Sequence, residues 1–122
     1  MESRKLALRV ASVAKSKKAE DVRILDLRSL AAFCDYFVIL SAQSLRQTNA
    51  IAEAVQDDLS RLNLKPLSRI PAEDKSGWIV LDFRSVIVHI FYKPIREYYS
   101  LERLWQDAKK VRVSTRKKSP AR

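Results

Sequence analysis

The sequence predicts an α/β (α+β) fold, with a mixed sheet of about five strands packed by helices in the order α-β-β-α-β-β-β-α. Two apolar, β-branched runs flank the short polar break at 82–85, as in a β-hairpin buried on at least one face. A capped amphipathic helix is indicated over 44–63. Only about six residues, 29–34, separate two further strands, which is too short for a parallel crossover and favours an antiparallel pair.

The chain is predicted to begin with one helix and two strands. Residues 3–18 place apolar side chains at helical spacing, and Ser3 is suited to cap that helix. Residues 21–28 alternate loosely between apolar and polar, as a strand with one solvated face does. Residues 35–41 are almost continuously apolar, which is typical of a strand covered on both faces.

The next helix has recognisable start and stop signals. Ser44 and Gln47 have the spacing of a capping box, in which each side chain accepts the other's backbone N–H. Asn63 tolerates the left-handed backbone that ends a helix, and Pro66 prevents continuation. Residues 67–70 then predict a short strand at an edge of the sheet.

After the hairpin the sequence has a helical pattern, which gives way to a segment rich in lysine and arginine. Pro94 is placed to begin a helix, because the N–H that proline lacks has no partner within the helix at its first position. Ser100 starts a second helical segment. From about residue 110 the composition can bury too little to order itself. We therefore predict a single domain over 1–109 and a basic, disordered tail over 110–122.

Composition narrows the class of protein. The chain has 122 residues, 47% of them hydrophobic and 31% charged, as in one soluble globular domain. No run approaches the ~20 apolar residues of a membrane span, and no signal-peptide stretch follows Met1, so we predict a cytoplasmic protein without membrane attachment. The single cysteine, Cys34, excludes an internal disulfide, and the single glycine, Gly77, excludes glycine-rich phosphate loops.

The net charge of +10 is concentrated near the C-terminus. Between Lys109 and Arg122 seven residues are basic and none is acidic, which leaves 17 basic against 14 acidic residues in the rest of the chain. The folded part is therefore close to neutral. Direct binding of RNA through the tail stays open as an alternative function. The candidate rRNA-contacting residues are Lys109, Lys110, Arg112, Arg116, Lys117 and Lys118.

A search for catalytic groups finds no complete set. His89 is the only histidine and alternates onto one strand face with apolar neighbours, so we interpret it first as a packed or hydrogen-bonded residue and second as a partner contact. Cys34 has no local base. No Asp-x-Asp pair is present to bind Mg²⁺. We predict no catalytic residue, no metal site and no cofactor, and a protein that is not an enzyme; a nucleotidyltransferase-like enzyme remains a remote alternative.

Aromatic residues are unusually dense between 78 and 105. Tyr98 and Tyr99 are adjacent, so on a helix they point about 100° apart and at least one of these rings should reach the surface. Exposed Trp, Tyr and Arg are the residues that most often anchor protein interfaces. This stretch is therefore predicted to form a protein-docking face.

The same residues resemble the ribosomal silencing factor (RsfS, Iojap-like) family. The resemblance covers about residues 5–109 and is carried by DYFVI (35–39), the SLRQ…AIA helix start (44–52), WIVLDF (78–83), VIVHIF (86–91) and REYYSLERLW (96–105). It implies a fold related to nucleotidyltransferases without their catalytic residues. One departure is at the hairpin turn, where the family usually has Gly-Asp and this chain has Arg84-Ser85, which puts the turn geometry in question.

The resemblance also implies a function. It indicates a non-enzymatic factor that binds the large ribosomal subunit through ribosomal protein L fourteen, sterically blocks joining of the small subunit and represses translation. Some relatives in organelles act in large-subunit assembly, which is an alternative here, and some members are homodimers when free. The partner-binding residues it implies are Trp78, Asp82, Arg84, His89, Arg96, Tyr98, Tyr99, Glu102 and Trp105.

Overall fold

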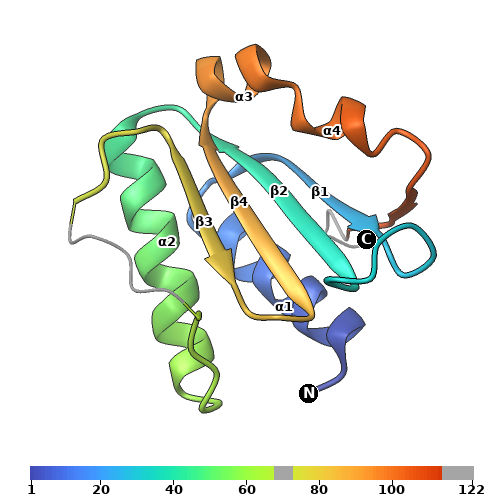
Figure 1. Ribbon diagram of the computed structural model, residues 1–122. Coiled ribbons are helices and arrows are strands. Elements are labelled where there is room, and N and C mark those ends of the chain that lie inside the picture. The colour runs from blue at the N-terminus through green and yellow to red at the C-terminus, as the bar shows by residue number, and fades with distance from the viewer. Residues whose placement is uncertain (68–72, 114–122) are drawn as a thin grey trace, which may run out of the picture.

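A five-stranded mixed sheet forms the centre of the protein (Figure 1). The computed structural model describes residues 1–67 and 73–113. Its elements are, in chain order, α1 (Ser3–Ser16), β1 (Glu20–Asp26), β2 (Tyr36–Ala42), α2 (Leu45–Ser60), β3 (Trp78–Asp82), β4 (Val86–Tyr92), α3 (Lys93–Tyr99), α4 (Leu101–Leu104) and β5 (Lys109–Val111). The strand order is β3-β4-β2-β1-β5, which confirms the predicted mixed sheet packed by helices.

The strands combine two local antiparallel pairings with two pairings between segments far apart in the sequence. β1 and β2 are antiparallel, as the short connection predicts, and β3 and β4 form the predicted hairpin. β2 pairs in parallel with β4, with Tyr36 opposite Val86 and Ala42 opposite Tyr92. All seven residues of β2 are buried, so the prediction of a strand covered on both faces is confirmed.

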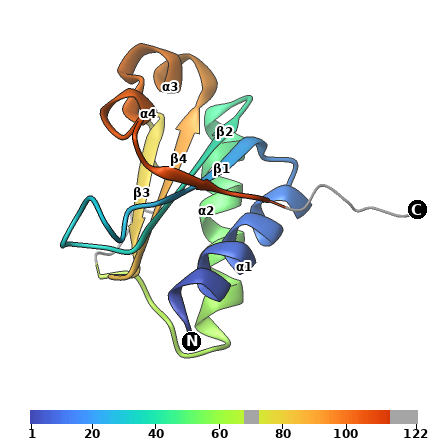
Figure 2. The ribbon, with the colours of Figure 1, turned by 90° about the vertical axis from the view of Figure 1, so that its right-hand side faces the viewer.

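The two faces of the sheet are covered unequally. Helices α1 and α2 lie together on one face and bury the larger apolar core. The exposed guanidinium of Arg9 joins these helices through an ion pair with Asp58. Figure 2 shows α3 and α4 at one end of the opposite face, where a smaller apolar cluster lies. This second face is where the aromatic residues gather.

The last strand, β5, was not predicted. Lys109–Val111 pair antiparallel with β1, and Val111 lies buried opposite Ile24, so the ordered domain extends past residue 109. The alternating Val-Arg-Val at 111–113 is a two-residue period of the kind that signals a strand, but the surrounding positive charges hid it. The predicted strand at 67–70 falls mostly outside the described residues, although the backbone N–H of Leu67 donates to the carbonyl of Asp82.

Helix starts agree only partly with their predicted caps. Glu2 precedes α1 without a side-chain hydrogen bond, so Ser3 is not the cap but the first helical residue. Ser44 does cap α2, because its Oγ accepts the N–H of Gln47 at 3.0 Å. The Gln47 side chain accepts from the backbone of Gln43 instead of Ser44, so the reciprocal half of the capping box is shifted by one residue.

The hairpin turn keeps a left-handed residue even though glycine is absent. Arg84 has φ +72°, and its N–H donates to the Oδ1 of Asp82 at 2.8 Å. A side chain in this conformation is strained by roughly 1–2 kcal/mol. The turn therefore has the backbone that a glycine would suit, and Asp82 supplies a hydrogen bond that helps to hold it.

We expect Arg84→Gly to raise the free energy of unfolding by about 0.5–1 kcal/mol, because relief of the left-handed strain outweighs the added freedom of the unfolded chain. Urea denaturation followed by circular dichroism measures the change. The matched control is Ser85→Gly, one residue along and at negative φ, which should lower stability by a few tenths of a kcal/mol or more. Equal effects of the two glycines would contradict the strain at Arg84.

Candidate protein-docking surface

An unbroken series of ring contacts crosses the sheet face opposite α1 and α2. We call it the aromatic surface, and its members are Phe33, Phe37, Trp78, His89, Phe91, Tyr98, Tyr99 and Trp105. Ring centroids are 5.8 Å apart for Phe37 and Trp105 and 4.5 Å apart for Phe37 and His89. Trp78 continues the series, at 4.9 Å from Phe91 and 5.1 Å from Tyr99.

Strand alternation explains why these rings meet. Successive side chains of a strand point to opposite faces, so Trp78 shares a face with Val80 on β3 while Ile79 and Leu81 turn into the main core. Trp78 lies directly opposite Phe91 on the neighbouring strand. Aromatic pairs of this kind stabilise a sheet by roughly 0.5–1.5 kcal/mol each beyond their burial.

The outer edge of the aromatic surface is open to solvent. Tyr98 is 80% exposed and Tyr99 54% exposed, which confirms that at least one of these rings reaches the surface. Trp78 and Trp105 are half-buried. Phe33, in the loop between β1 and β2, is 59% exposed. Such a concentration of exposed rings is uncommon on a surface that has no partner.

Three exposed apolar residues, one of them Phe33 of the aromatic surface, were missed in the sequence. The sequence predicts Phe33 within the connection 29–34, and no local pattern indicates that this loop folds back against Trp105. Leu104 is exposed at the end of the short helix α4. Val80 could have been found, since alternation places it on the same face as Trp78.

His89 lies beneath the rings instead of among the exposed residues. Trp78 Nε1–H donates to His89 Nδ1 at 3.1 Å, so the histidine proton resides on Nε2. Burial lowers the pKa of His89 to about 4. This confirms the interpretation of a packed, hydrogen-bonded residue. His89 is buried here, and its place among the partner-binding residues stays a prediction.

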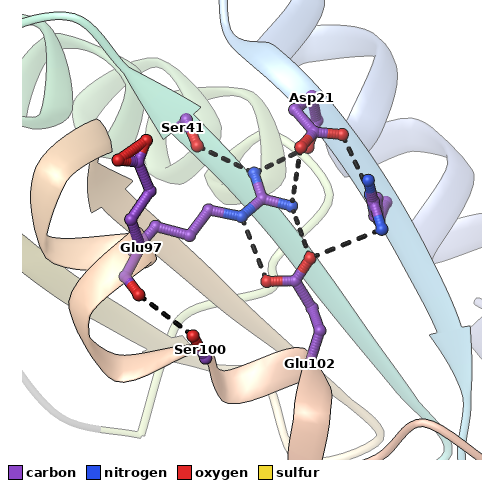
Figure 3. A network of polar contacts seen from close by, with 7 residues as sticks. Asp21, Ser41, Glu97, Ser100 and Glu102 are labelled. Carbon is purple, nitrogen blue, oxygen red and sulfur yellow. Dashed lines mark hydrogen bonds and ion pairs between the residues drawn. The ribbon is translucent and has the colours of Figure 1, made fainter.

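Arg96 is also internal. It is 6% exposed, and its guanidinium binds both carboxylate oxygens of Glu102, at 3.1 and 3.0 Å (Figure 3). Its Nη1 donates to Ser41 Oγ and to the backbone carbonyl of Asp21, both at 2.8 Å. We call Arg96, Glu102, Ser41 and Asp21 the Arg96 cluster.

The Arg96 cluster connects four elements of the fold. It joins α3 and α4 to the ends of β1 and β2, and Ser100 makes the sharp turn between the two helices at φ +48°. Partial burial opposes ionisation of the Asp21 carboxyl, but a hydrogen bond from Arg23 and the charge of Arg96 together lower its pKa. The cluster fixes the segment that carries Tyr98 and Tyr99. Arg96 and Glu102 thus hold this segment in place, and their role as direct partner contacts stays a prediction.

The remaining predicted residues are dispersed. Asp82 is half-buried and caps the hairpin turn, and Arg84 is exposed beside it. Lys109, Lys110 and Arg112 are exposed on and after β5. Arg116, Lys117 and Lys118 lie outside the described residues.

Residues 1–67 and 73–113 contain no group of three His, Cys, Asp or Glu side chains placed to hold a metal ion. Cys34 is buried, and burial raises the pKa of its thiol to about 11. Within the same ranges no helix is long and apolar enough to cross a membrane.

The fold and this surface define a small α+β domain that exposes aromatic residues on one sheet face. The family model described as "Ribosomal silencing factor during starvation" (RsfS) matches residues 1–122, and the chain belongs to this family.

The comparison with individual proteins agrees with that family. The ribosomal silencing factor RsfS of Bacillus subtilis is 35% identical over 107 residues, which cover 87% of this chain and 90% of that protein. The mouse protein named mitochondrial assembly of ribosomal large subunit protein 1 is 29% identical over 79% of this chain and 43% of its own length. A crystal structure of a Chromobacterium violaceum protein shares the fold, with a TM-score of 0.81 at 23% identity over 95% of both chains.

We expect acid to destabilise the protein through His89. Its folded pKa lies below the ordinary value of 6.5, so its contribution to stability is complete above pH 6.5 and is lost as the pH falls towards 4. The loss at pH 4 is about 3 kcal/mol. Urea unfolding at several pH values should show a shallower decline for His89→Gln than for the unchanged protein. Parallel declines would mean that His89 is not a buried neutral group.

Loss of the Arg96 guanidinium should be costly. We expect Arg96→Met to lower the free energy of unfolding by about 2–4 kcal/mol, because Glu102 and Ser41 lose their buried partner. The control Arg103→Met, on an exposed neighbour in α4, should change stability by less than about 0.5 kcal/mol. Chemical denaturation of both variants tests this, and similar small effects would rule out a structural role for the Arg96 cluster.

Proposed function

We propose that this protein is a non-enzymatic ribosomal silencing factor of the cytoplasm. In this proposal it binds the large ribosomal subunit through ribosomal protein L fourteen, sterically blocks association with the small subunit, and so represses translation. Family membership supports the general role, and the Bacillus subtilis relative is named for it. The observation that carries the docking step is the exposed part of the aromatic surface.

The aromatic surface has the physical properties of a docking site. Tyr and Trp bury much area on binding while losing little conformational freedom, so a few such rings can supply most of an interface's affinity. Tyr98, Tyr99, Phe33, Trp78 and Trp105 are the proposed anchors. Arg84, at the hairpin turn, is a proposed charged contact at the edge of the interface, where such groups favour specificity more than affinity.

The proposed mechanism needs no chemical step. A domain held on the joining face of one subunit excludes the other by volume alone, so neither nucleotide nor metal is required. Rigid presentation helps, because a pre-ordered surface pays less entropy on binding. The Arg96 cluster provides that rigidity by tying α3 and α4 to the sheet. A homodimer of the free protein that covers the same rings is a further part of this proposal.

Participation in assembly of the large subunit is a second candidate. The name of the mouse relative supports it, and it uses the same partner particle. The two functions differ in timing. A silencing factor acts on finished subunits and competes with the small subunit, whereas an assembly factor binds immature particles and its loss leaves them to accumulate.

We expect Tyr98→Ala to weaken binding to purified large subunits about tenfold or more, since an anchor ring contributes at least about 1–2 kcal/mol. Its stability should hardly change, because the ring is 80% exposed. Cosedimentation with large subunits measures binding, and a subunit-joining assay on sucrose gradients measures the block.

The control is Leu62→Ala, which removes a partly exposed apolar side chain just after α2, away from the aromatic surface. It should leave both assays unchanged. Equal binding by Tyr98→Ala and the unchanged protein would refute docking through the aromatic surface. Binding to intact ribosomes with no preference for the free large subunit would refute the steric block.

A further inference from the structure

We infer that α1 and β5 form a second contact surface, which binds the phosphate backbone of RNA. The first observation is the composition of the helix. Residues 3–18 contain six lysine and arginine residues and no acid. No comparable excess occurs in α2, where Asp57, Asp58 and Glu53 accompany a single arginine, Arg46.

The structure places α1 beside β5. Val111 on β5 is buried in the same apolar core as the inner face of α1, and Val113 packs against that core. Figure 2 looks onto this edge of the sheet, with β5 in front and α1 beside it. Exposed cations line this edge from both of its faces. Arg4, Lys5, Lys17 and Lys18 lie on α1 or just after it. Lys110 and Arg112 lie on β5 or just after it and alternate to the strand face opposite Val111.

These cations are not neutralised within the protein. Across residues 1–67 and 73–113, none of the six takes part in an ion pair. Two acids on neighbouring elements are occupied by other groups, since Asp58 of α2 binds Arg9 and Asp26 of β1 binds Arg28. The positive field of this side is thus available to an external polyanion.

The geometry favours an extended anion over a compact one. Arg4 and Lys17 are separated by about one helix length, roughly 20 Å, so a single small anion cannot reach both. A nucleic-acid backbone presents phosphates along such a distance. Each phosphate that is neutralised releases counterions, which makes binding strong at low salt and steeply salt-dependent.

A membrane surface fits this side less well. Helices that lie on membranes insert an apolar face while their cations meet the lipid headgroups. The apolar face of α1 already packs against the sheet. Its buried residues are Leu6, Ala7, Val10, Ala11 and Ala14. The choice of RNA over other polyanions rests on the proposed function, in which the partner is a ribosomal particle.

The α1 part of this surface is separate from the aromatic surface. Helix α1 covers one face of the sheet, and the aromatic rings lie on the other. The aromatic surface and α1 can therefore be occupied at once, with protein docking on one face and backbone contacts along α1 on the other. Two weak contacts joined in one rigid body reinforce each other through their effective concentration.

The test compares two variants of equal charge. One combines Arg4→Gln, Lys5→Gln, Lys17→Gln and Arg112→Gln. The control combines Arg46→Gln, Arg61→Gln, Lys65→Gln and Lys75→Gln, which are exposed residues on α2 and the segment after it. Both full-length variants keep residues 114–122, so any contribution of that segment is the same in each. Binding to a fluorescent 20-base-pair RNA duplex is measured by anisotropy between 50 and 200 mM KCl.

We expect the first variant to lose about tenfold or more in affinity at 100 mM KCl and to reduce the log–log salt slope by about 2–4. The control should lose much less. Tyr98→Ala should bind the duplex like the unchanged protein, which separates this inference from the proposed function: large-subunit docking can fail while RNA binding persists, and the reverse.

Three outcomes would overturn the inference. Equal losses in the two charge variants would mean that net charge alone governs binding. No measurable binding of the duplex by the unchanged protein would remove the RNA surface itself. Tighter binding to phosphatidylserine vesicles than to the duplex, lost in the first variant, would assign the surface to membranes instead.

Discussion

The fold depends on a strand that must be covered on both faces. Every residue of β2 is buried, and β2 connects the two hairpins by pairing with β1 on one side and β4 on the other. Two long helices satisfy one face of the sheet. The other face has only the short helices α3 and α4 and a loop, which are too small to enclose it. Aromatic rings complete the cover, and the outermost of them remain in contact with water.

Polar groups at that second face are arranged to hold the short helices in place. Arg96 replaces the packing that a longer helix would provide, since it reaches across to Ser41 on β2 and the backbone at Asp21 while binding Glu102. A desolvated guanidinium is tolerable only when its donors are satisfied, and here three different groups accept from it. Electrostatic interactions therefore contribute as much as apolar packing to holding the segment with the exposed tyrosines in place.

Much of this architecture follows from local sequence signals. Continuous apolar residues predict the burial of β2, and a six-residue connection predicts its antiparallel pairing with β1, because both depend on a few neighbouring positions. The strand β5 was missed, since its two valines stand among cations and its partner lies over 80 residues away. Only part of the candidate surface could be predicted from the sequence. Adjacent tyrosines require one exposed ring, but only the folded chain shows that Arg96 and His89 turn inward or that Phe33 comes alongside Trp105.

The parallel pairing of β2 with β4 also affects how this chain folds during its synthesis. The first 60 residues, which leave the translating ribosome early, include β2 but neither of the strands β4 and β5 that close the sheet. Pairing at such long sequence separation is intrinsically slow, because much chain entropy is lost before the contacts form. During synthesis the apolar edge of β2 stays without its partner until β4 emerges. Until then the nascent chain exposes an unpaired apolar strand that is prone to aggregate. Binding of a chaperone therefore protects the chain most in this interval.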